Sequence, residues 1–375
     1  MIYLDYAANT PAAKEVLDYF CEESIRYYGN PNSTHKAGIL AKERMDGITG
    51  DVAGLLKVKP SEIIYTSGAS ESNNLAIKGV TYTYRHRGKH IISTCLEHSS
   101  VSGALTALQK QGYEIDLVDI LPNGQVDLNH LEELLRDDTI LVSVSYVDSE
   151  LGVVQPVREI AELTGRRSRC FFHVDATQAV GKIEIDLDNI DLLSFSAHKF
   201  YGINGCGILV RKENVVLEPL IHGGASTTEF RSGTPAVGLA ASIYKALKLS
   251  EEALKERYLY VEQLNQYVRN ELMKYPLVRI NSTDKAIPHV LNLSVKGVKG
   301  TQFQQALAER DICVSVKSAC SVANTVSRPV YAVTRDKKNA MCSWRISLSY
   351  LTRQEEADTF LKIFDECYGM LTQTK

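Results

Sequence analysis

Lys199 is the residue whose position most suggests chemistry. It closes the segment Ser196–Lys199, which directly follows the apolar run Leu192–Phe195. A lysine at the end of a buried strand is costly, and desolvation lowers its pKa, which frees the amine as a nucleophile. Such an amine can form a Schiff base with an aldehyde cofactor. Because most lysines are solvated surface residues, this interpretation needs support from the rest of the chain.

Polar residues also follow three other strand candidates. Thr66–Asn74 comes after a strand and opens a helix, so it is either a phosphate cradle or a serine-rich helix cap without a ligand. Asp175 ends an apolar strand and either pairs with a protonated ring nitrogen or caps the next helix. His98 closes a strand and either stacks on a flat ring and moves protons or has a structural role.

Alternating strand and helix patterns predict how these residues are positioned. Apolar runs rich in Val, Ile and Phe lie at residues 63–66, 90–95, 140–147, 170–175, 192–196 and 207–210. Helical patterns between them, at 102–111 and 128–136, favour a mostly parallel sheet with helices on both faces. Ligands bind beyond the carboxyl ends of the strands in such sheets, where the polar residues described above are expected.

The pattern changes after Gly238. The apolar spacing predicts a long helical region over Leu239–Tyr275. We expect a smaller α+β lobe beyond it. Residues 321–343 are polar and predict a loop with at most one helical turn. The segments that predict the smaller lobe are 290–295, 302–310, 312–316, 345–348 and 354–368.

Composition narrows the function classes. The net charge is −3 without a dense Lys/Arg stripe, which does not suggest nucleic-acid binding. The N-terminus does not resemble a secretory signal, and no apolar run approaches the roughly 20 residues that span a bilayer. The eight cysteines form no CxxC pair and no zinc spacing, so we expect no metal site. We therefore expect a cytoplasmic protein with reduced thiols and without membrane contact.

Eight motifs occur in one order along the chain, at 3–11, 29–35, 66–74, 150–156, 173–178, 196–199, 231–234 and 318–320. Together they resemble the pyridoxal-phosphate enzymes of aminotransferase fold type I, class V, and within that class the cysteine desulfurases of the NifS/IscS type. The resemblance covers essentially the whole chain. It implies an α/β fold with a large domain, 15–240, built on a mostly parallel sheet flanked by helices. Residues 1–14 with 241–375 would form a smaller α+β domain that carries the catalytic cysteine loop.

The resemblance implies how pyridoxal 5′-phosphate (PLP) would be bound. Lys199 would hold the cofactor covalently and later move the substrate Cα proton. Asp175 would keep the ring nitrogen protonated, Gln178 would hydrogen-bond the ring oxygen, and His98 would stack on the ring face. Thr234 would reach the phosphate bound by a neighbouring subunit, which implies a homodimer. The residues that would bind the phosphate within the chain are Ala69, Ser70, Ser196 and His198.

The resemblance also implies conversion of L-cysteine to L-alanine. Arg345 would grip the substrate carboxylate, because a guanidinium is permanently charged and can make two parallel hydrogen bonds. Asn32 would also contact the substrate. Cys320 would take the substrate sulfur as a persulfide. The long stretch from Cys320 to Arg345 is similar to that of desulfurases that pass sulfur to scaffold proteins. We therefore expect a sulfur-acceptor protein, either an Fe–S cluster scaffold or a tRNA-thiolation enzyme.

The chain departs from the family pattern at three positions. Asp148 and Ser149 stand where the family usually has two asparagines, and Lys317 replaces a glycine. Ser149 would contact the cofactor with a shorter side chain than asparagine, and Asp148 would disfavour a carboxylate substrate if it pointed inward. These departures leave two alternatives open. The first is another class-V PLP enzyme, such as a transaminase or a β-lyase, and the second is a weakly catalytic binding scaffold.

Overall fold

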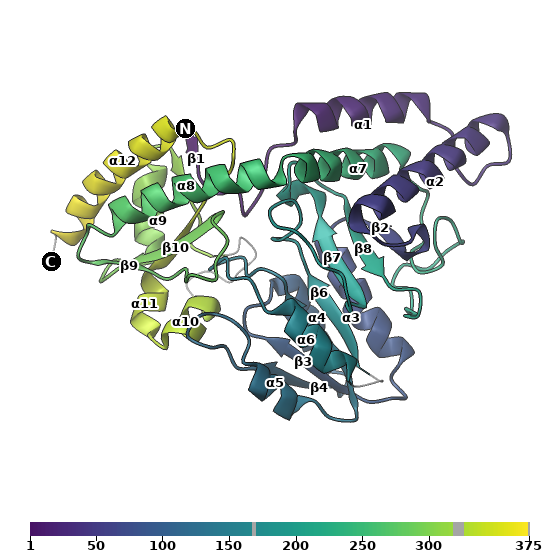
Figure 1. Cartoon of the computed structure of the whole chain (residues 1–375), viewed down its shortest axis with the longest axis horizontal. Coiled ribbons are helices and arrows are strands. Elements are labelled where there is room, and N and C mark those ends of the chain that lie inside the picture. The colour runs from purple at the N-terminus through teal and green to yellow at the C-terminus, as the bar shows by residue number, and fades with distance from the viewer. Residues whose placement is uncertain (167–169, 318–325, 374–375) are drawn as a thin grey trace.

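A seven-stranded sheet forms the centre of the larger part of the computed structural model, which describes residues 1–166, 170–317 and 326–373 (Figure 1). The strand order is β2-β8-β7-β6-β5-β3-β4, and β8 is antiparallel to both of its neighbours while the other pairs are parallel. The mostly parallel sheet is therefore confirmed. The strands are β2 (Ile63–Thr66), β3 (His90–Thr94), β4 (Glu114–Val118), β5 (Thr139–Ser145), β6 (Phe171–Asp175), β7 (Leu192–Ser196) and β8 (Gly207–Arg211).

Helices cover both faces of this sheet, because its inner strands are apolar on both sides. Helices α3 and α4 pack on one face, and α2, α5, α6 and α7 pack on the other. Helix α1 lies along α7 (Figure 1). These helices are α1 (Lys14–Arg26), α2 (Lys36–Leu56), α3 (Ala69–Thr83), α4 (Ser99–Gln109), α5 (Leu128–Leu134), α6 (Val157–Gly165) and α7 (Val237–Glu252).

The second part of the chain has two small sheets, with strand orders β12-β10-β9 and β1-β11. Its core is built around Trp344, whose ring stacks on Phe303 at 5.0 Å, and Phe364 packs against both. The elements are β1 (Ile2–Tyr3), α8 (Leu254–Leu272), β9 (Val278–Ile280), β10 (Val290–Val295), α9 (Gly300–Ala308), β11 (Ile312–Cys313), β12 (Ser343–Ser347) and α12 (Gln354–Thr372).

We propose the division 15–240 and 1–14 with 241–375, because one hydrophobic cluster centres on each part. The clusters do not separate at residue 240, since the part of α7 beyond it and Ile287 belong to the first cluster, and a small cluster joins Leu151 and Val153 to Val330 and Ala340. Leu4 from the N-terminal segment belongs to the second cluster, because β1 pairs in parallel with β11. Val16, two residues into α1, already belongs to the first cluster. Helix α8 continues from α7 and connects the two parts (Figure 1).

Two segments differ from the expectation. The helical region over 239–275 consists of α7 and α8, which are separated at Ala253, where φ is −113° and ψ is 8°. The loop expected over 321–343 contains helices α10 (Arg328–Thr334) and α11 (Lys337–Cys342). The side chains of Ser327 and Asp336 cap these helices. Such caps favour short helices even where the apolar pattern is weak.

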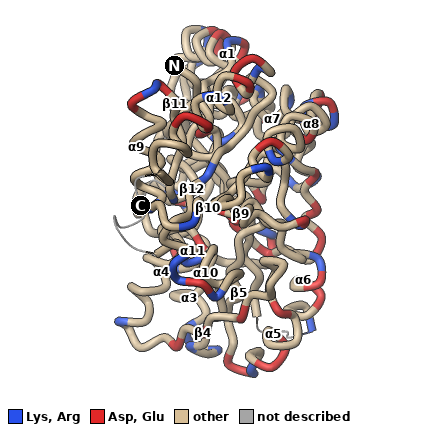
Figure 2. Tube along the Cα trace, turned by 90° about the vertical axis from the view of Figure 1, so that its left-hand side faces the viewer, with Lys and Arg blue, Asp and Glu red and all other residues tan. Residues whose placement is uncertain are grey.

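Basic and acidic residues are interspersed along the chain (Figure 2). Several form pairs one helical turn apart, such as Lys14 with Asp18 and Lys42 with Asp46. Within the described ranges, no group of three or more His, Cys, Asp or Glu side chains is arranged to hold a metal ion. None of the described helices combines the length and the apolar character needed to cross a membrane.

Candidate active site

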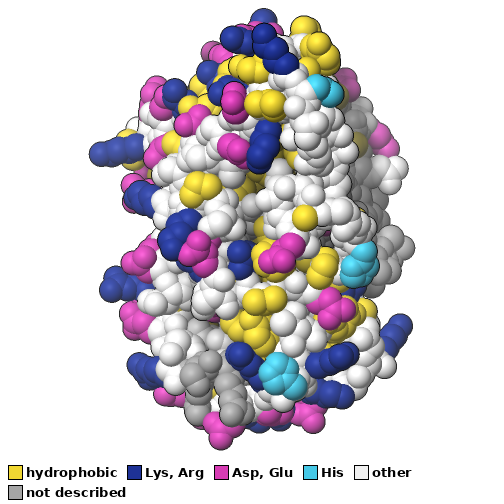
Figure 3. All heavy atoms as spheres, turned by 90° about the vertical axis from the view of Figure 1, so that its right-hand side faces the viewer, with side chains coloured by type: hydrophobic (Ala, Val, Ile, Leu, Met, Phe, Trp, Pro, Cys, Tyr) yellow, Lys and Arg dark blue, Asp and Glu magenta, His cyan; other side chains and the backbone are white. Residues whose placement is uncertain are grey.

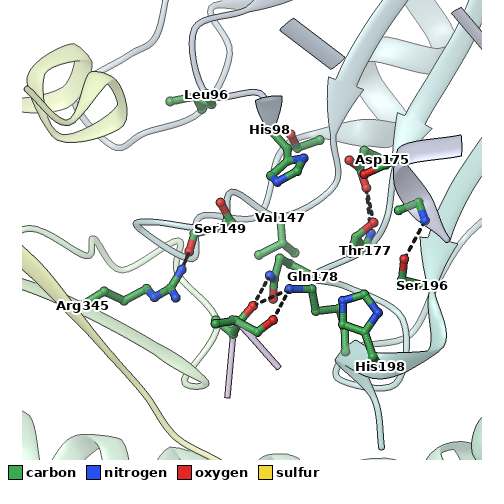
Figure 4. Close-up of a pocket in the computed structure, with 16 residues that line it drawn as sticks. Leu96, His98, Val147, Ser149, Asp175, Thr177, Gln178, Ser196, His198 and Arg345 are labelled. Carbon is green, nitrogen blue, oxygen red and sulfur yellow. Dashed lines mark hydrogen bonds between the residues drawn. The ribbon is translucent and has the colours of Figure 1, made fainter. Parts of the chain in front are cut away.

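Five strands that run in the same direction end at one pocket of about 230 Å³ (Figure 4). Arg345 reaches the pocket from β12, and Ala7 and Ala8 reach it from the N-terminal segment, so the pocket lies where the two parts of the chain meet. Most of the predicted site residues line it. These are Ala69, Ser70, His98, Ser149, Asp175, Gln178, Ser196, His198, Lys199 and Arg345.

The start of α3 forms an anion cradle at one end of the pocket. Gly68 precedes the helix with φ at +143° and, as a glycine, has no side chain of its own to cap the helix. The backbone N–H of Ala69 donates to Ser196 Oγ over 2.6 Å, which brings the end of β7 to the helix start. A Cβ at Gly207 would lie 2.7 Å from Gly68 Cα, so glycine permits this close approach. Uncapped N–H groups at a positive helix end favour a phosphate.

Asp175 ends β6 and is 6% exposed. Its Oδ2 accepts from Asn73 Nδ2 over 2.7 Å, and its Oδ1 accepts from the N–H and the hydroxyl of Thr177. The carboxylate therefore caps the following turn, and it also lines the pocket, as a partner for a ring nitrogen must. A carboxylate with several fixed donors keeps its orientation, which suits it to hold a protonated nitrogen.

His98 is the N-cap of α4, and its Nδ1 accepts from the N–H of Ser100 at 3.2 Å. This contact leaves the proton of the neutral ring on Nε2. Burial is the main cause that lowers the pKa of His98, and Lys199 lowers it further, against an opposing effect of Asp175. The ring is consequently neutral near pH 7, and a neutral imidazole can stack on a flat ligand.

Lys199 ends a 3-10 turn, Ala197–Lys199, directly after β7. Its Nζ donates to the backbone carbonyls of Ala7 at 2.9 Å and Ala8 at 2.6 Å, and these contacts hold the amine at the pocket wall. Burial and the charge of Lys199 lower the pKa of the adjacent His198 to about 4, so this histidine is neutral.

Arg345 is 1% exposed and joins the two parts of the chain at the pocket. Its Nη2 donates to Asp5 Oδ1 at 2.8 Å, and its Nη1 donates to the Ser149 carbonyl at 2.6 Å (Figure 4). Asp5 is itself held by the Ser315 hydroxyl at 2.7 Å. The buried Nε of Arg345 has no hydrogen-bond partner. A guanidinium held in a fixed orientation at a pocket is suited to bind a carboxylate.

Asp148 does not point toward the substrate side. It is fully buried and does not line the pocket, and its Oδ2 accepts from the N–H groups of Glu150 and Leu151. Asp148 would disfavour a carboxylate substrate only if its side chain pointed into the pocket, and it does not. Ser149 does line the pocket, and its backbone carbonyl holds Arg345.

Three predicted site residues remain, of which the structure describes two. Cys320 lies outside the described residues. Thr234 and Asn32 are exposed and do not line the pocket of their own chain. Asn32 exchanges hydrogen bonds with the Ser226 hydroxyl at 3.0 and 3.1 Å.

The structure adds site residues that the sequence did not single out. Ala7 and Ala8 act through their backbone carbonyls, which no side-chain pattern reports. Asn73 holds Asp175, and it lies within the motif 66–74, which drew attention only as a phosphate cradle. Lys182 donates to Gln178 Oε1 at 2.7 Å. The two residues are four positions apart in the sequence, and this spacing was the one feature that could have indicated their contact.

Residues 2–360 match the aminotransferase class-V family. The chain belongs to this family. A cysteine desulfurase IscS of Pseudoalteromonas translucida is 38% identical over 386 residues, which cover 99% of this chain and 94% of that protein. A solved NifS-like protein superimposes with a TM-score of 0.92 and 34% identity, covering 99% of this chain and all of that one. The structure described as SspA in complex with cysteine gives a TM-score of 0.81 and 31% identity, covering 93% of this chain and 99% of that one.

Members of this class-V family use PLP, so the predicted family, fold and cofactor are confirmed. The described residues fit this cofactor. The uncapped start of α3 suits its phosphate, and the fixed carboxylate of Asp175 suits its ring nitrogen. The amine of Lys199 suits its aldehyde and lies in the same pocket.

Proposed function

We propose that this protein converts L-cysteine to L-alanine and transfers the sulfur to Cys320 for delivery to an acceptor protein. The observation that carries the proposal is that Lys199, Asp175 and Arg345, from distant parts of the chain, line a single pocket. The similarity to a cysteine desulfurase over nearly the full length of both chains supports the substrate, as does the likeness to a protein whose structure holds cysteine.

The residues of the pocket have separate tasks in this proposal. PLP supplies an electron sink when bound. Asp175 would hold the proton on the ring nitrogen, and Gln178 would donate its amide N–H to the ring oxygen. The neutral ring of His98 would cover one face. The amine of Lys199 takes and returns the proton at the substrate Cα.

Arg345 binds and orients the substrate carboxylate. Its contacts with Asp5 and the Ser149 carbonyl hold the guanidinium plane, and each Nη carries a second hydrogen that can be donated to a ligand. Ion pairing with Asp5 restrains the side chain, so little conformational entropy is lost when a carboxylate binds. We assign substrate selection by the α-carboxylate to this residue.

The sulfur transfer balances without an external oxidant. The substrate C–S bond breaks, an S–S bond forms between the substrate sulfur and Cys320 Sγ, and L-alanine leaves. One thiol and one molecule of L-cysteine thus give one persulfide and one molecule of L-alanine. An Fe–S scaffold or a tRNA-thiolation enzyme would then receive the terminal sulfur.

We propose that a second copy of the chain completes the site. The segment with Thr234 is tied beside the cradle, because Arg231 Nε donates to Glu71 Oε1 at 2.8 Å. Thr234 is exposed and does not line its own pocket, so its hydroxyl is available to a partner's phosphate. Hydrophobic side chains are visible on the side of the molecule that lies to the right in Figure 1 (Figure 3). Exposed apolar residues on and beside α1 and α2 support such an interface, namely Ile25, Tyr28, Ile39 and Leu40.

The proposal is tested by incubating the PLP-loaded protein with L-cysteine and a thiol reductant. We expect L-alanine and sulfide in equal amounts and, without the reductant, a mass gain of one sulfur on the Cys320 peptide. Cys320→Ser should abolish both, and Cys21→Ser, at an exposed cysteine, should abolish neither. Absence of alanine from the loaded protein would reject the desulfurase. Activity on another amino acid that survives Cys320→Ser would favour a different class-V reaction.

A further inference from the structure

Lys182 is a buried lysine behind the pocket wall. Its side chain follows Gln178 by four residues, is 8% exposed and does not line the pocket. Its Nζ donates to Gln178 Oε1 at 2.7 Å. The other end of the same amide, Nε2, donates to the Ala7 carbonyl at 2.9 Å.

These two contacts fix which way the Gln178 amide faces. If the amide turned by 180°, its NH₂ group would face the ammonium of Lys182 and its oxygen would face the Ala7 carbonyl. Both contacts would then be repulsive, because donor would meet donor and acceptor would meet acceptor. The observed orientation places the NH₂ group beside Ala7, which lines the pocket. The amide nitrogen carries two hydrogens, one for Ala7 and one for a ligand.

The charges around Lys182 are unfavourable for a buried ammonium. Burial lowers its pKa to about 7, and the positive charges of Lys199 and Arg345 act in the same direction. His289 also faces it and is neutral, because burial and then Lys182 lower the pKa of that ring to about 3. Among the described carboxylates, none forms an ion pair with Lys182. A buried charge of this kind lowers stability unless an anion enters the site.

We propose that Lys182 is a positioning residue of the cofactor site, which holds the Gln178 amide with its N–H toward the ring oxygen and strengthens that N–H as a donor. An ammonium on the amide oxygen polarises the amide, so its N–H binds an anionic oxygen more strongly. The positive charge also favours the anionic form of the ring oxygen. This inference rests on the proposed function only in requiring that the pocket binds PLP.

The first test is PLP binding to the cofactor-free protein. We expect Lys182→Met, which keeps the length of the side chain, to raise the PLP dissociation constant about tenfold, as loss of a hydrogen bond to a charged group does. Lys182→Arg, which keeps charge and donors, should stay within about threefold of the wild type. In a Gln178→Ala background, Lys182→Met should have less than about a twofold effect, because Lys182 acts through Gln178.

Two further measurements separate positioning from a structural role. The pH midpoint of the visible absorption band of the bound cofactor should rise in Lys182→Met, because loss of a nearby positive charge makes proton uptake easier. The cofactor-free Lys182→Met protein should unfold at a higher urea concentration than the wild type at pH 6, since an unpaired buried charge is removed. A purely structural lysine predicts the opposite shift in urea.

An unchanged dissociation constant and an unchanged pH midpoint in Lys182→Met would overturn the inference. Failure of Lys182→Met to fold would also overturn it, because the positioning role predicts a more stable cofactor-free protein. Either result leaves the proposed function intact as long as the wild type binds PLP and releases L-alanine from L-cysteine. A wild type that binds no PLP would instead reject the proposed function.

Discussion

Asp148→Asn should stabilise the protein more at pH 8 than at pH 5. The Asp148 carboxyl is fully buried and its Oδ1 has no hydrogen-bond partner. Burial and then the charge of Glu150 raise its pKa from 3.8 to about 7. The folded state therefore binds more protons than the unfolded state between about pH 4 and 7, and the free energy of unfolding falls as the pH rises through this window. Asparagine is neutral at every pH in this window, so the Asp148→Asn protein does not lose this part of its stability.

The size of this stability difference follows from the pH range in which the folded state binds more protons and which lies between pH 5 and pH 8. From pH 5 to the folded pKa of about 7, each unit corresponds to about 1.4 kcal/mol, so the advantage of asparagine over aspartate should grow by roughly 2–3 kcal/mol. Any change in the free energy of unfolding that Asp148→Asn causes equally at both pH values cancels in this difference. Urea unfolding of the cofactor-free proteins, followed by circular dichroism at both pH values, measures it. Asp188→Asn, at an exposed aspartate, is the control and should show no such growth. If Asp148→Asn differed from the wild type by the same free energy at pH 5 and at pH 8, the reasoning would be refuted.

Three further predictions address the ligand contacts. Arg345→Lys should raise KM for L-cysteine about 10–100-fold, because lysine lacks the planar pair of donors; steady-state kinetics with unchanged KM would contradict the carboxylate role. Asp175→Asn should still bind PLP but lower kcat by about 100-fold or more, since an amide does not hold the ring proton; an unchanged kcat would count against this. Gly68→Ala should weaken PLP binding roughly tenfold, because φ is +143° and the new Cβ would lie 3.1 Å from Ser196 Oγ. Gly47→Ala, whose Cβ would have nothing within 4 Å, should bind PLP normally.

Strand ends were the predictable part of the site. The bounds of β2, β7 and β10 agree with the apolar runs at 63–66, 192–196 and 290–295. In a mostly parallel sheet, these patterns also predict that Asp175 and Lys199 meet at one edge. Strand β4 was not predicted, because it lies at the sheet edge and its charged, partly exposed residues lack an apolar run.

Contacts that depend on tertiary packing were not predictable. The carbonyls of Ala7 and Ala8 become acceptors for Lys199 only because the N-terminal segment returns to the pocket. The direction of Asp148 is set by the backbone N–H groups of its own turn, which the sequence does not indicate. The pairing of Lys182 with Gln178 depends on how the chain turns after β6, where Gly181 has φ at +75° and a Cβ would lie 2.5 Å from Phe200 Cβ.

The site of covalent attachment tests the central claim most directly. The PLP-loaded protein is reduced with borohydride and digested, and the peptides are mapped by mass spectrometry. We expect a pyridoxyl group on Lys199, which lines the pocket, and none on Lys182, which does not line it. A pyridoxyl group on another lysine, or none after PLP has been supplied in excess, would contradict this expectation.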